Sequence, residues 1–249
     1  MRILLSNDDS VAAAGLHQLA EELRKLGDVF IAAPDRVRSG ASSALTIAEP
    51  ILATEVGKDI WSVTGTPADS VKLAIHELMK RPPDVVVSGI NNGLNTGSNV
   101  LYSGTVAAAL EGAQYGITAF AISRPFGEND RFRSEAKLSA KVVAKLMSGR
   151  LGRRTAYNIN LPPNKKPRGV LVTTVEPRPY QDRFDKRVDP RGRTYYWLRG
   201  TPPREVPRNG RASDDWAIEN GYVSVTPLRR DLTDASLLDD AARAFPKQD

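Results

Sequence analysis

The sequence predicts a doubly wound α/β fold, in which a mostly parallel sheet lies between two layers of helices. Two observations lead to this prediction. Over the first 160 residues, short and continuously apolar runs alternate with amphipathic stretches of helical period. Such runs are typical of parallel strands that helices cover on both faces. The chain has 249 residues, of which 41% are hydrophobic, so it can bury a full core.

The expected elements of this first part follow from the apolar pattern. The expected strands are Arg2–Ser6, Val29–Pro34, Ile60–Gly65, Asp84–Gly89, Ile117–Ser123 and Thr155–Pro162. The expected helices are the stretch from Leu16 to Leu26, the stretch from Val71 to Met79, Thr105–Tyr115 and Leu138–Met147. Each of these helices places its apolar side chains on one face, which would pack against the sheet.

The pattern changes beyond Pro162. Further strands are expected at Val170–Val175 and Tyr222–Leu228, with a hairpin between them. Its expected turn is Asp189-Pro190-Arg191-Gly192, because Asp, Pro and Gly are typical turn residues. Another tight turn is expected at Asn209-Gly210, and a short helix at Ala235–Phe245.

Charge is unevenly distributed. Residues 150–211 contain 16 Lys and Arg and 5 Asp and Glu, a net +11, so a chain of net charge +6 leaves −5 elsewhere. The same stretch holds nine of the 17 Pro. It indicates a projecting arm or a surface that attracts phosphates; the alternative is a solvated connector. We expect one domain over residues 1–249, with a core of about 1–162 plus 213–249 and a basic extension of about 163–212.

Several classes of protein are excluded or disfavoured. The chain has no Cys, which excludes disulfides, thiolate nucleophiles and Cys-based zinc sites. No apolar run approaches the length of a membrane span, and the acidic pair Asp8-Asp9 comes too early for a signal peptide. We therefore expect a soluble cytoplasmic protein with no membrane partner. Both His are expected on the surface, which argues against a Ser-His-Asp triad. The missing G-x-G-x-x-G argues against a nucleotide-binding oxidoreductase or transferase on the same sheet.

Polar residues gather where three expected strands end. In open α/β sheets, ligands bind outside the carboxyl ends of the strands, so we expect these residues to face one crevice. They are Asn7, Asp8 and Asp9 after the first strand, Ser39, Gly40 and Ser42 after the second, and Asn91, Asn95, Ser103, Gly104 and Thr105 after the strand Asp84–Gly89.

The adjacent carboxylates of Asp8 and Asp9 need an explanation, because they repel each other. A helix cap would use only one of them. Carboxylate, amide and hydroxyl oxygens are hard donors that suit Mg²⁺ or Mn²⁺, and two carboxylates roughly neutralise a dication. The pair therefore predicts a cation site, with a simple cap as the alternative. The start of the helix at Ser103-Gly104-Thr105 is likewise either a cap or a phosphate cradle.

Six blocks of the sequence resemble one known family. They are ILLSNDD, PDRVRSGAS, VTGTPADSVKLA, VVSGINNGLNTGSNVLYSGTVAAALEG, NINLP and NGYVSVTPLRRDLTD, within residues 2–234. Together they resemble the SurE (survival protein E) family of metal-dependent nucleoside monophosphate phosphatases. The resemblance implies a Rossmann-like domain whose C-terminal extension forms dimers, sometimes tetramers.

The resemblance also implies a ligand set and an activity. One divalent cation per subunit, Mg²⁺ or Mn²⁺, would be held by Asp8, Asp9, Ser39 and Asn95. The expected reaction is hydrolysis of 5′- and 3′-nucleoside monophosphates, and some family members also trim short polyphosphate or RNA ends. Asp8 or Asp9, whichever is less tightly coordinated, would accept the proton of the attacking water.

The remaining expectations are the catalytic and substrate-binding residues and the positions at which this sequence departs from the family pattern. The expected catalytic residues are Asp8, Asp9 and Asn95, and the expected substrate-binding residues are Asn7, Gly40, Ser42, Asn91, Ser103, Gly104 and Thr105. Three positions depart from the family pattern: Ser10 stands where Gly is common, Val37 where Asn is common and Ser70 where Cys is frequent.

A nucleic-acid-binding module is the alternative function. Aromatic residues alternate with Arg in the basic extension, as in stacking platforms for single strands. They are Tyr180, Phe184, Tyr195, Tyr196 and Trp197. The same aromatics could instead pack an oligomer interface.

Overall fold

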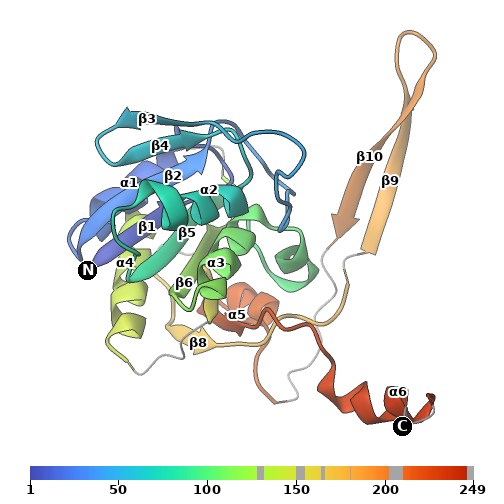
Figure 1. The fold of residues 1–249 in the computed structure, drawn as a ribbon. Coiled ribbons are helices and arrows are strands. Elements are labelled where there is room, and N and C mark those ends of the chain that lie inside the picture. The colour runs from blue at the N-terminus through green and yellow to red at the C-terminus, as the bar shows by residue number, and fades with distance from the viewer. Residues whose placement is uncertain (128–131, 150–154, 164–165, 180, 202–209, 246–249) are drawn as a thin grey trace.

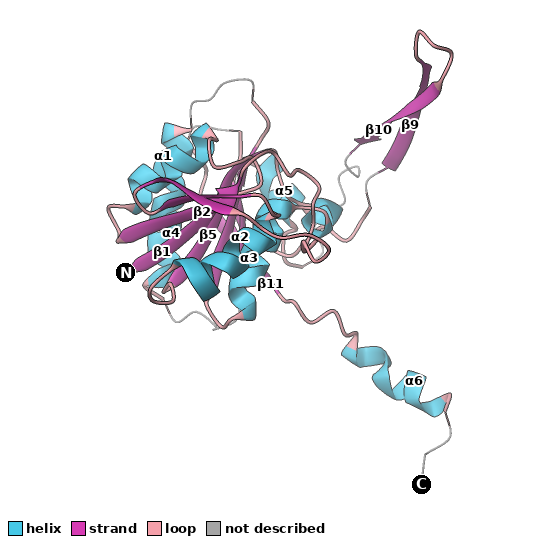
Figure 2. Cartoon of the chain, turned by 45° about the horizontal axis from the view of Figure 1, so that its top comes forward, coloured by secondary structure: helices cyan, strands magenta, loops and turns pink. Residues whose placement is uncertain are grey.

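The computed structural model describes residues 1–127, 132–149, 155–163, 166–179, 181–201 and 210–245. In this part of the chain, a nine-stranded sheet runs in the order β3-β4-β2-β1-β5-β6-β7-β11-β8. Helices cover both of its faces, while a two-stranded hairpin, β9 and β10, and a C-terminal helix, α6, project from the body (Figures 1 and 2). The predicted three-layer α/β architecture with a C-terminal hairpin is confirmed.

The elements have the following bounds. The strands of the main sheet are β1 Arg2–Ser6, β2 Asp28–Pro34, β3 Ala53–Gly57, β4 Ile60–Val63, β5 Val85–Asn92, β6 Thr118–Arg124, β7 Ala156–Asn160, β8 Val170–Val172 and β11 Val223–Leu228. The hairpin consists of β9 Gln181–Val188 and β10 Thr194–Thr201. The helices are α1 Ala14–Leu23, α2 Pro67–Leu73 with a π-helical turn Ala74–Leu78, the 3-10 helix η2 Gly97–Leu101, α3 Gly104–Gln114, α4 Arg133–Met147, α5 Asp214–Glu219, the 3-10 turn Ala235–Leu237 and α6 Leu238–Arg243.

The middle of the sheet explains the continuous apolar runs. Strand β1 pairs in parallel with β2 on one side and β5 on the other. Both of its faces are therefore covered: Ile3 and Leu5 belong to the core cluster that includes α1 and α4, and Leu4 to the cluster that includes α2 and α3. Burial on both sides favours apolar residues at successive positions rather than at alternate ones.

Several elements differ from expectation; helix α2, for example, begins at Pro67 rather than near Val71, and β5 continues past Gly89 to Asn92. The edge strand β3 was not expected, because the middle of Ala53–Gly57 is exposed and lacks an apolar pattern. The six-residue helix α5 is too short to show a helical period. Helix α4 begins at Arg133 rather than near Leu138, and β8 ends at Val172 rather than Val175.

The sheet is parallel except where β3 meets β4 and where β11 meets β7. Strand β8, which lies inside the expected extension of 163–212, joins the main sheet beside β11. The boundaries of that extension remain a prediction.

The hairpin turns where the sequence predicted. The backbone N–H of Gly192 donates to the carbonyl oxygen of Asp189 at 2.9 Å, and the Asp189 carboxylate accepts the backbone N–H groups of Arg191 and Arg193. Of the other expected turn, Asn209 lies outside the described residues, and Gly210 has a φ of +92°. Among the helices that the structure describes, none is long and apolar enough to cross a bilayer.

Candidate functional site

Three polar loops lie at one edge of the sheet, as expected. Ser6 at the end of β1 pairs with Ser88 of β5, so the chain after each parallel strand leaves at the same side. Strand β5 approaches β6 closely there: a Cβ on Gly89 would lie 2.4 Å from the carbonyl oxygen of Ile122. Only Gly fits at this position, which also has a φ of +130°.

Asp8 is the residue on which three segments converge. Its side chain is only 4% exposed, and the Thr105 hydroxyl at the start of α3 donates to its Oδ1. A Cβ on Gly104 would lie 2.9 Å from the Asp8 Cβ, so the first turn of α3 presses against the carboxylate. The backbone N–H of Arg38 donates to the Asp8 carbonyl oxygen at 2.8 Å, which brings the exposed Ser39 and Gly40 to the same place.

The acidic pair carries an electrostatic cost. Burial raises the pKa of Asp8 to about 6; the Thr105 hydroxyl opposes this shift and the neighbouring charge of Asp9 adds to it. Burial also raises the pKa of the half-buried Asp9, and a backbone N–H donated by Asn92 opposes this shift. Both carboxylates would therefore be stabilised by a cation, and a simple helix cap does not explain the second of them.

The donor chemistry fits a hard divalent cation. Asn7 is fully buried; its Nδ2 donates to the carbonyl oxygen of Ser10, but its Oδ1 has no hydrogen-bond partner among the described residues. Within the part of the chain that the structure describes, no three His, Cys, Asp or Glu side chains lie together in a group that could hold a metal ion. With only two carboxylates, neutral amide and hydroxyl oxygens must complete the coordination, which suits Mg²⁺ or Mn²⁺.

Asn95 is fixed from the neighbouring strands. Its backbone N–H donates to Asn160 Oδ1 at 2.9 Å, and its carbonyl oxygen accepts from Asn158 Nδ2 at 2.7 Å and Asn160 Nδ2 at 3.1 Å. Its own Nδ2 donates to Ser123 Oγ at 2.8 Å. These bonds leave the Asn95 Oδ1 without a hydrogen bond to any described residue, and so available as an oxygen ligand.

The expected phosphate-binding residues have structural partners as well. Ser103 caps α3, accepting the backbone N–H of Val106 at 3.1 Å. Ser42, with a φ of +51°, donates from Oγ to the carbonyl oxygen of Leu101 at 2.6 Å. Asn91 Nδ2 donates to the carbonyl oxygen of Gly93 at 2.8 Å. Gly40 has a φ of +73° and no atom within 4 Å of a Cβ built on it, so its backbone stays open to a ligand.

The departure at Ser10 has a structural consequence. Ser10 has a φ of +97°, a backbone conformation that residues with a Cβ rarely adopt. Gly, which is common at this position in the family resembled, would adopt it without strain. The chain therefore keeps a strained residue one position after the acidic pair.

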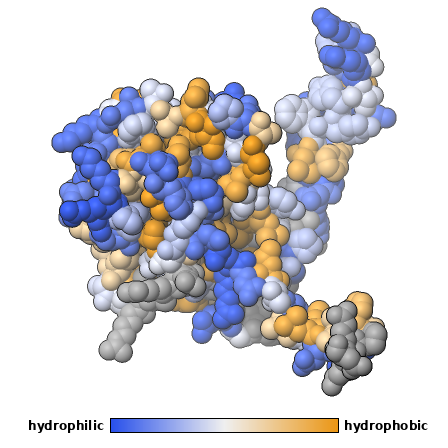
Figure 3. All heavy atoms as spheres, in the orientation of Figure 1, coloured by the Kyte–Doolittle hydropathy of each residue, from blue (hydrophilic) through white to orange (hydrophobic). Residues whose placement is uncertain are grey.

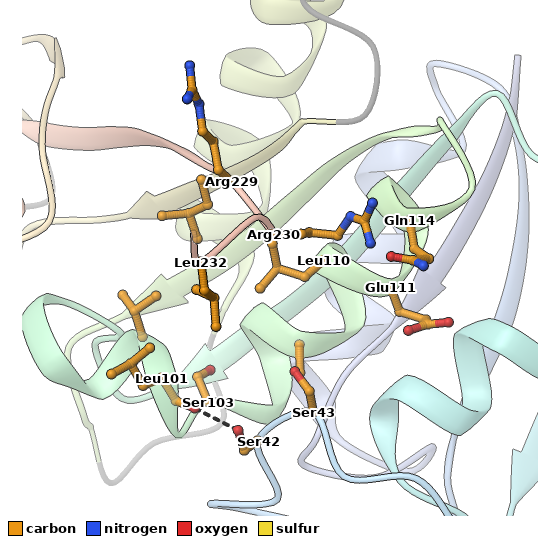
Figure 4. A pocket seen from close by; sticks show the side chains of 13 residues that line it. Ser42, Ser43, Leu101, Ser103, Leu110, Glu111, Gln114, Arg229, Arg230 and Leu232 are labelled. Atoms are coloured by element: carbon orange, nitrogen blue, oxygen red, sulfur yellow. Dashed lines mark hydrogen bonds between the residues drawn. The ribbon is translucent and has the colours of Figure 1, made fainter. Parts of the chain in front are cut away.

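A pocket lies beside the start of α3 (Figure 4). It has a volume of about 440 Å³, within the size range of small-ligand sites. Ser42 and Ser103 line it together with apolar Leu101, Leu110 and Leu232. Two of the expected phosphate-binding residues, Ser42 and Ser103, thus border a partly apolar cavity.

Sequence reasoning gave no role at the site to four residues around it: Ser123, Asn158, Asn160 and Asp214. Asn158 and Asn160 carried a usable signal, because two polar residues at i and i+2 put amides on one face of an otherwise apolar strand. Asp214 gave no comparable signal.

Comparisons of the whole chain with known proteins show what it is similar to. The model of the family described as survival protein SurE matches residues 3–182. A protein named 5′-nucleotidase SurE from Pelotomaculum thermopropionicum is 44% identical over 244 residues, covering 96% of this chain and 93% of that protein. One of the same name from Legionella pneumophila (strain Paris) is 45% identical over 242 residues, covering 96% and 95%. The crystal structure of the SurE protein from Aquifex aeolicus superposes with a TM-score of 0.86 at 38% identity, covering 98% and 99%.

Proposed function

The chain belongs to the SurE family, and from this premise we propose that it is a divalent-metal-dependent phosphatase of nucleoside 5′-monophosphates, and of 3′-monophosphates as well. The relatives named 5′-nucleotidase match nearly the whole chain, which supports the 5′-nucleotidase activity. The observation that carries the proposal is the Asp8 carboxylate, buried beside Asp9 at the first turn of α3.

Asp8, Asp9, Ser39 and Asn95 would hold the cation. When bound, Mg²⁺ or Mn²⁺ supplies Lewis-acid polarisation of the phosphoryl oxygen and lowers the pKa of a bound water. Thr105 fixes one oxygen of Asp8, which favours Asp8 as a ligand rather than a base. The half-buried Asp9 is the better acceptor for the proton of the attacking water, because it has access to solvent.

The start of α3 would bind the phosphate. This helix has 11 residues, and the first N–H groups of a helix have no partner within it. The Ser103 hydroxyl and the backbone N–H of Thr105 lie at this end of the helix. The open backbone of Gly40 lies in the loop after β2, and the amides of Asn7 and Asn91 lie just after β1 and near the end of β5. The nucleoside would then extend into the pocket lined by Leu101 and Leu110.

Phosphate release from a panel of 5′- and 3′-nucleoside monophosphates tests the proposal. We expect release to fall to background with EDTA and to return with excess Mg²⁺ or Mn²⁺. Circular dichroism of the chelated protein is the control for loss of fold. Release that continues unchanged in EDTA would contradict the metal dependence, and no release under any metal would contradict the activity. Including short polyphosphate and RNA in the panel tests the expected side activities.

We also propose that the hairpin forms a homo-oligomer contact, in a dimer or tetramer. In the β9–β10 register, opposite residues share a face. One face carries the exposed apolar residues Phe184, Val188, Tyr196 and Leu198. Figure 3 shows apolar residues on the C-terminal helix and at the lower end of the projecting hairpin, whose tip is hydrophilic. A solitary hairpin with this much exposed apolar surface gains stability when a second copy covers it.

The opposite face favours the alternative function. It carries Arg183, Arg187, Arg199, Tyr195 and Trp197, of which Arg199 pairs with Asp185 at 2.7 Å. Trp197 is 58% exposed, so cations and an aromatic ring are available to a single-stranded nucleic acid. Tyr180, the remaining expected aromatic, lies outside the described residues.

The expected location of the protein in the cytoplasm remains a prediction.

Matched double variants separate these two uses of the hairpin. We expect Phe184→Ser with Leu198→Ser to lower the mass measured by light scattering, and Tyr195→Ser with Trp197→Ser to leave it unchanged. A monomeric wild type would contradict the oligomer. Salt-dependent binding of single-stranded RNA, lost only in the second variant, would support the alternative.

A further inference from the structure

The loop that carries Asn95 is attached to the base of the hairpin arm, that is, to residues 174–176 before β9 and residues 212–215 after β10. Two residues after Asn95, the backbone N–H of Gly97 donates to Oδ2 of Asp214 at 3.1 Å. Asp214 begins α5, where the chain returns from the arm, and it is fully buried. A Cβ on Gly97 would lie 3.3 Å from Asp215 Oδ2 and 3.5 Å from Glu176 Cβ, so this loop lies directly against both ends of the arm.

The other oxygen of Asp214 binds the chain that enters the arm. Its Oδ1 accepts the backbone N–H of Glu176 at 2.9 Å and that of Asp215 at 2.9 Å. The two ends of the arm are also joined to each other, because Thr174 exchanges backbone hydrogen bonds with Ala212 and Asp214. One carboxylate thus holds three segments together: the loop after β5, the chain entering the arm and the chain leaving it.

Helix capping does not account for this carboxylate. Ser213 already caps α5, since its hydroxyl accepts the backbone N–H of Trp216. Of the three N–H groups that Asp214 accepts, two come from outside the helix, from Gly97 and Glu176. Burial raises the pKa of Asp214 to about 6, so keeping a charge here is costly, and the bonds from Gly97 and Glu176 partly offset that cost.

Thr96 strengthens the same attachment. Burial raises the pKa of Asp215 and the Thr96 side chain opposes that shift, so two successive residues of the loop lie against two successive residues of α5. Asn95, the residue before them, is held from β7 by Asn158 and Asn160. The loop therefore has two supports, one from the sheet and one from the base of the arm.

We propose that Asp214 is a positioning residue for Asn95, and that it couples the geometry of the metal site to the base of the hairpin arm. The inference rests on the proposed function, in which Asn95 is a metal ligand. Partners that hold a ligand in place typically change metal affinity or activity by about 10–100-fold when they are mutated.

The test is Asp214→Asn in the full-length protein, with Ile218→Ala as the matched control. The amide keeps the shape of the side chain but replaces one acceptor oxygen by a donor. Ile218 is buried on the same helix, so its truncation removes packing and leaves the carboxylate in place. Hydrogen exchange reports the backbone N–H groups of Gly97 and Glu176, calorimetry gives the Kd for Mn²⁺, and kinetics give kcat and KM.

In Asp214→Asn we expect both amides to lose protection, the Kd for Mn²⁺ to rise about tenfold or more, and excess Mn²⁺ to restore most of kcat. Ile218→Ala should leave the Kd unchanged. Unchanged Mn²⁺ affinity in Asp214→Asn, or an equal loss in Ile218→Ala, would overturn the inference. Wild type that neither binds Mn²⁺ nor releases phosphate would instead overturn the proposed function, while the exchange measurement still reports whether the attachment exists.

Discussion

Asp8→Asn is expected to make the metal-free protein more stable at pH 7.5 and to abolish its phosphatase activity. Burial raises the pKa of Asp8 from 3.8 to about 6, so the ionised carboxylate is unfavourable in the folded protein without metal. The amide removes that charge and still offers an oxygen to the Thr105 hydroxyl. We expect a gain of about 1–3 kcal/mol in the free energy of unfolding, or about 3–10 °C in Tm.

The pH dependence of this gain has a definite sign. A carboxyl group whose pKa is higher in the folded state binds its proton more tightly there, so its contribution to stability is complete below its unfolded pKa. That contribution is lost as pH rises through about 6. The difference in Tm between the variant and the wild type should therefore be small near pH 4 and should grow between pH 4 and about 7.

Thermal unfolding of both proteins in EDTA, and again with Mn²⁺, measures the effect. A ligand that binds only the folded state raises Tm by mass action, so Mn²⁺ should stabilise the wild type and have little effect on the variant. A less stable variant in EDTA at pH 7.5, or an equal response of both proteins to Mn²⁺, would contradict a cation site at Asp8.

The contacts of this site that could be predicted from the sequence are those between loops that follow neighbouring parallel strands. Asp8 and Thr105 are 97 residues apart, yet parallel strands end at one edge, so a pattern of strands and polar loops was enough to place them together. The hydrogen bonds that hold Asn95 could have been predicted for the same reason, because the parallel strand β7 ends at the same edge. Asn158 and Asn160 of that strand were not predicted to contact the site, because they entered the sequence analysis only as part of the block NINLP.

The attachment through Asp214 could not be predicted in this way. Asp214 lies 117 residues after Gly97, and the chain passes through the hairpin arm between them. The arm has no hydrophobic periodicity from which its path could be predicted. The position of Asp214 depends on β11 running antiparallel to β7 and on the short pairing of β8 with β11. The edge strand β3 was missed for a related reason: antiparallel pairing at an edge requires little burial, so the residues carry little pattern.

Gly104→Ala is expected to reduce kcat/KM by about 100-fold or more while leaving the protein folded. The added Cβ would lie 2.9 Å from the Cβ of Asp8 and 3.1 Å from its Oδ2, distances at which one of the two groups must move. It would also lie 3.1 Å from Cγ of Pro67, so α3 cannot simply shift away toward α2. The carboxylate should therefore be displaced from the position in which Thr105 holds it.

Stability should fall much less than activity. Ala is favoured over Gly by at most about 1 kcal/mol in a helix interior and by less at the first residue of a helix, so helix propensity offsets a small part of the strain. Gly93→Ala is the matched control, since its Cβ would meet only Asn91 Nδ2 at an ordinary 3.6 Å, and we expect at most a few-fold loss. Steady-state kinetics, thermal unfolding and the Kd for Mn²⁺ should be measured for both variants. Full activity in Gly104→Ala would mean that the position of Asp8 does not limit the reaction, whereas weakened Mn²⁺ binding in this variant alone would show that α3 sets the geometry of the cation site.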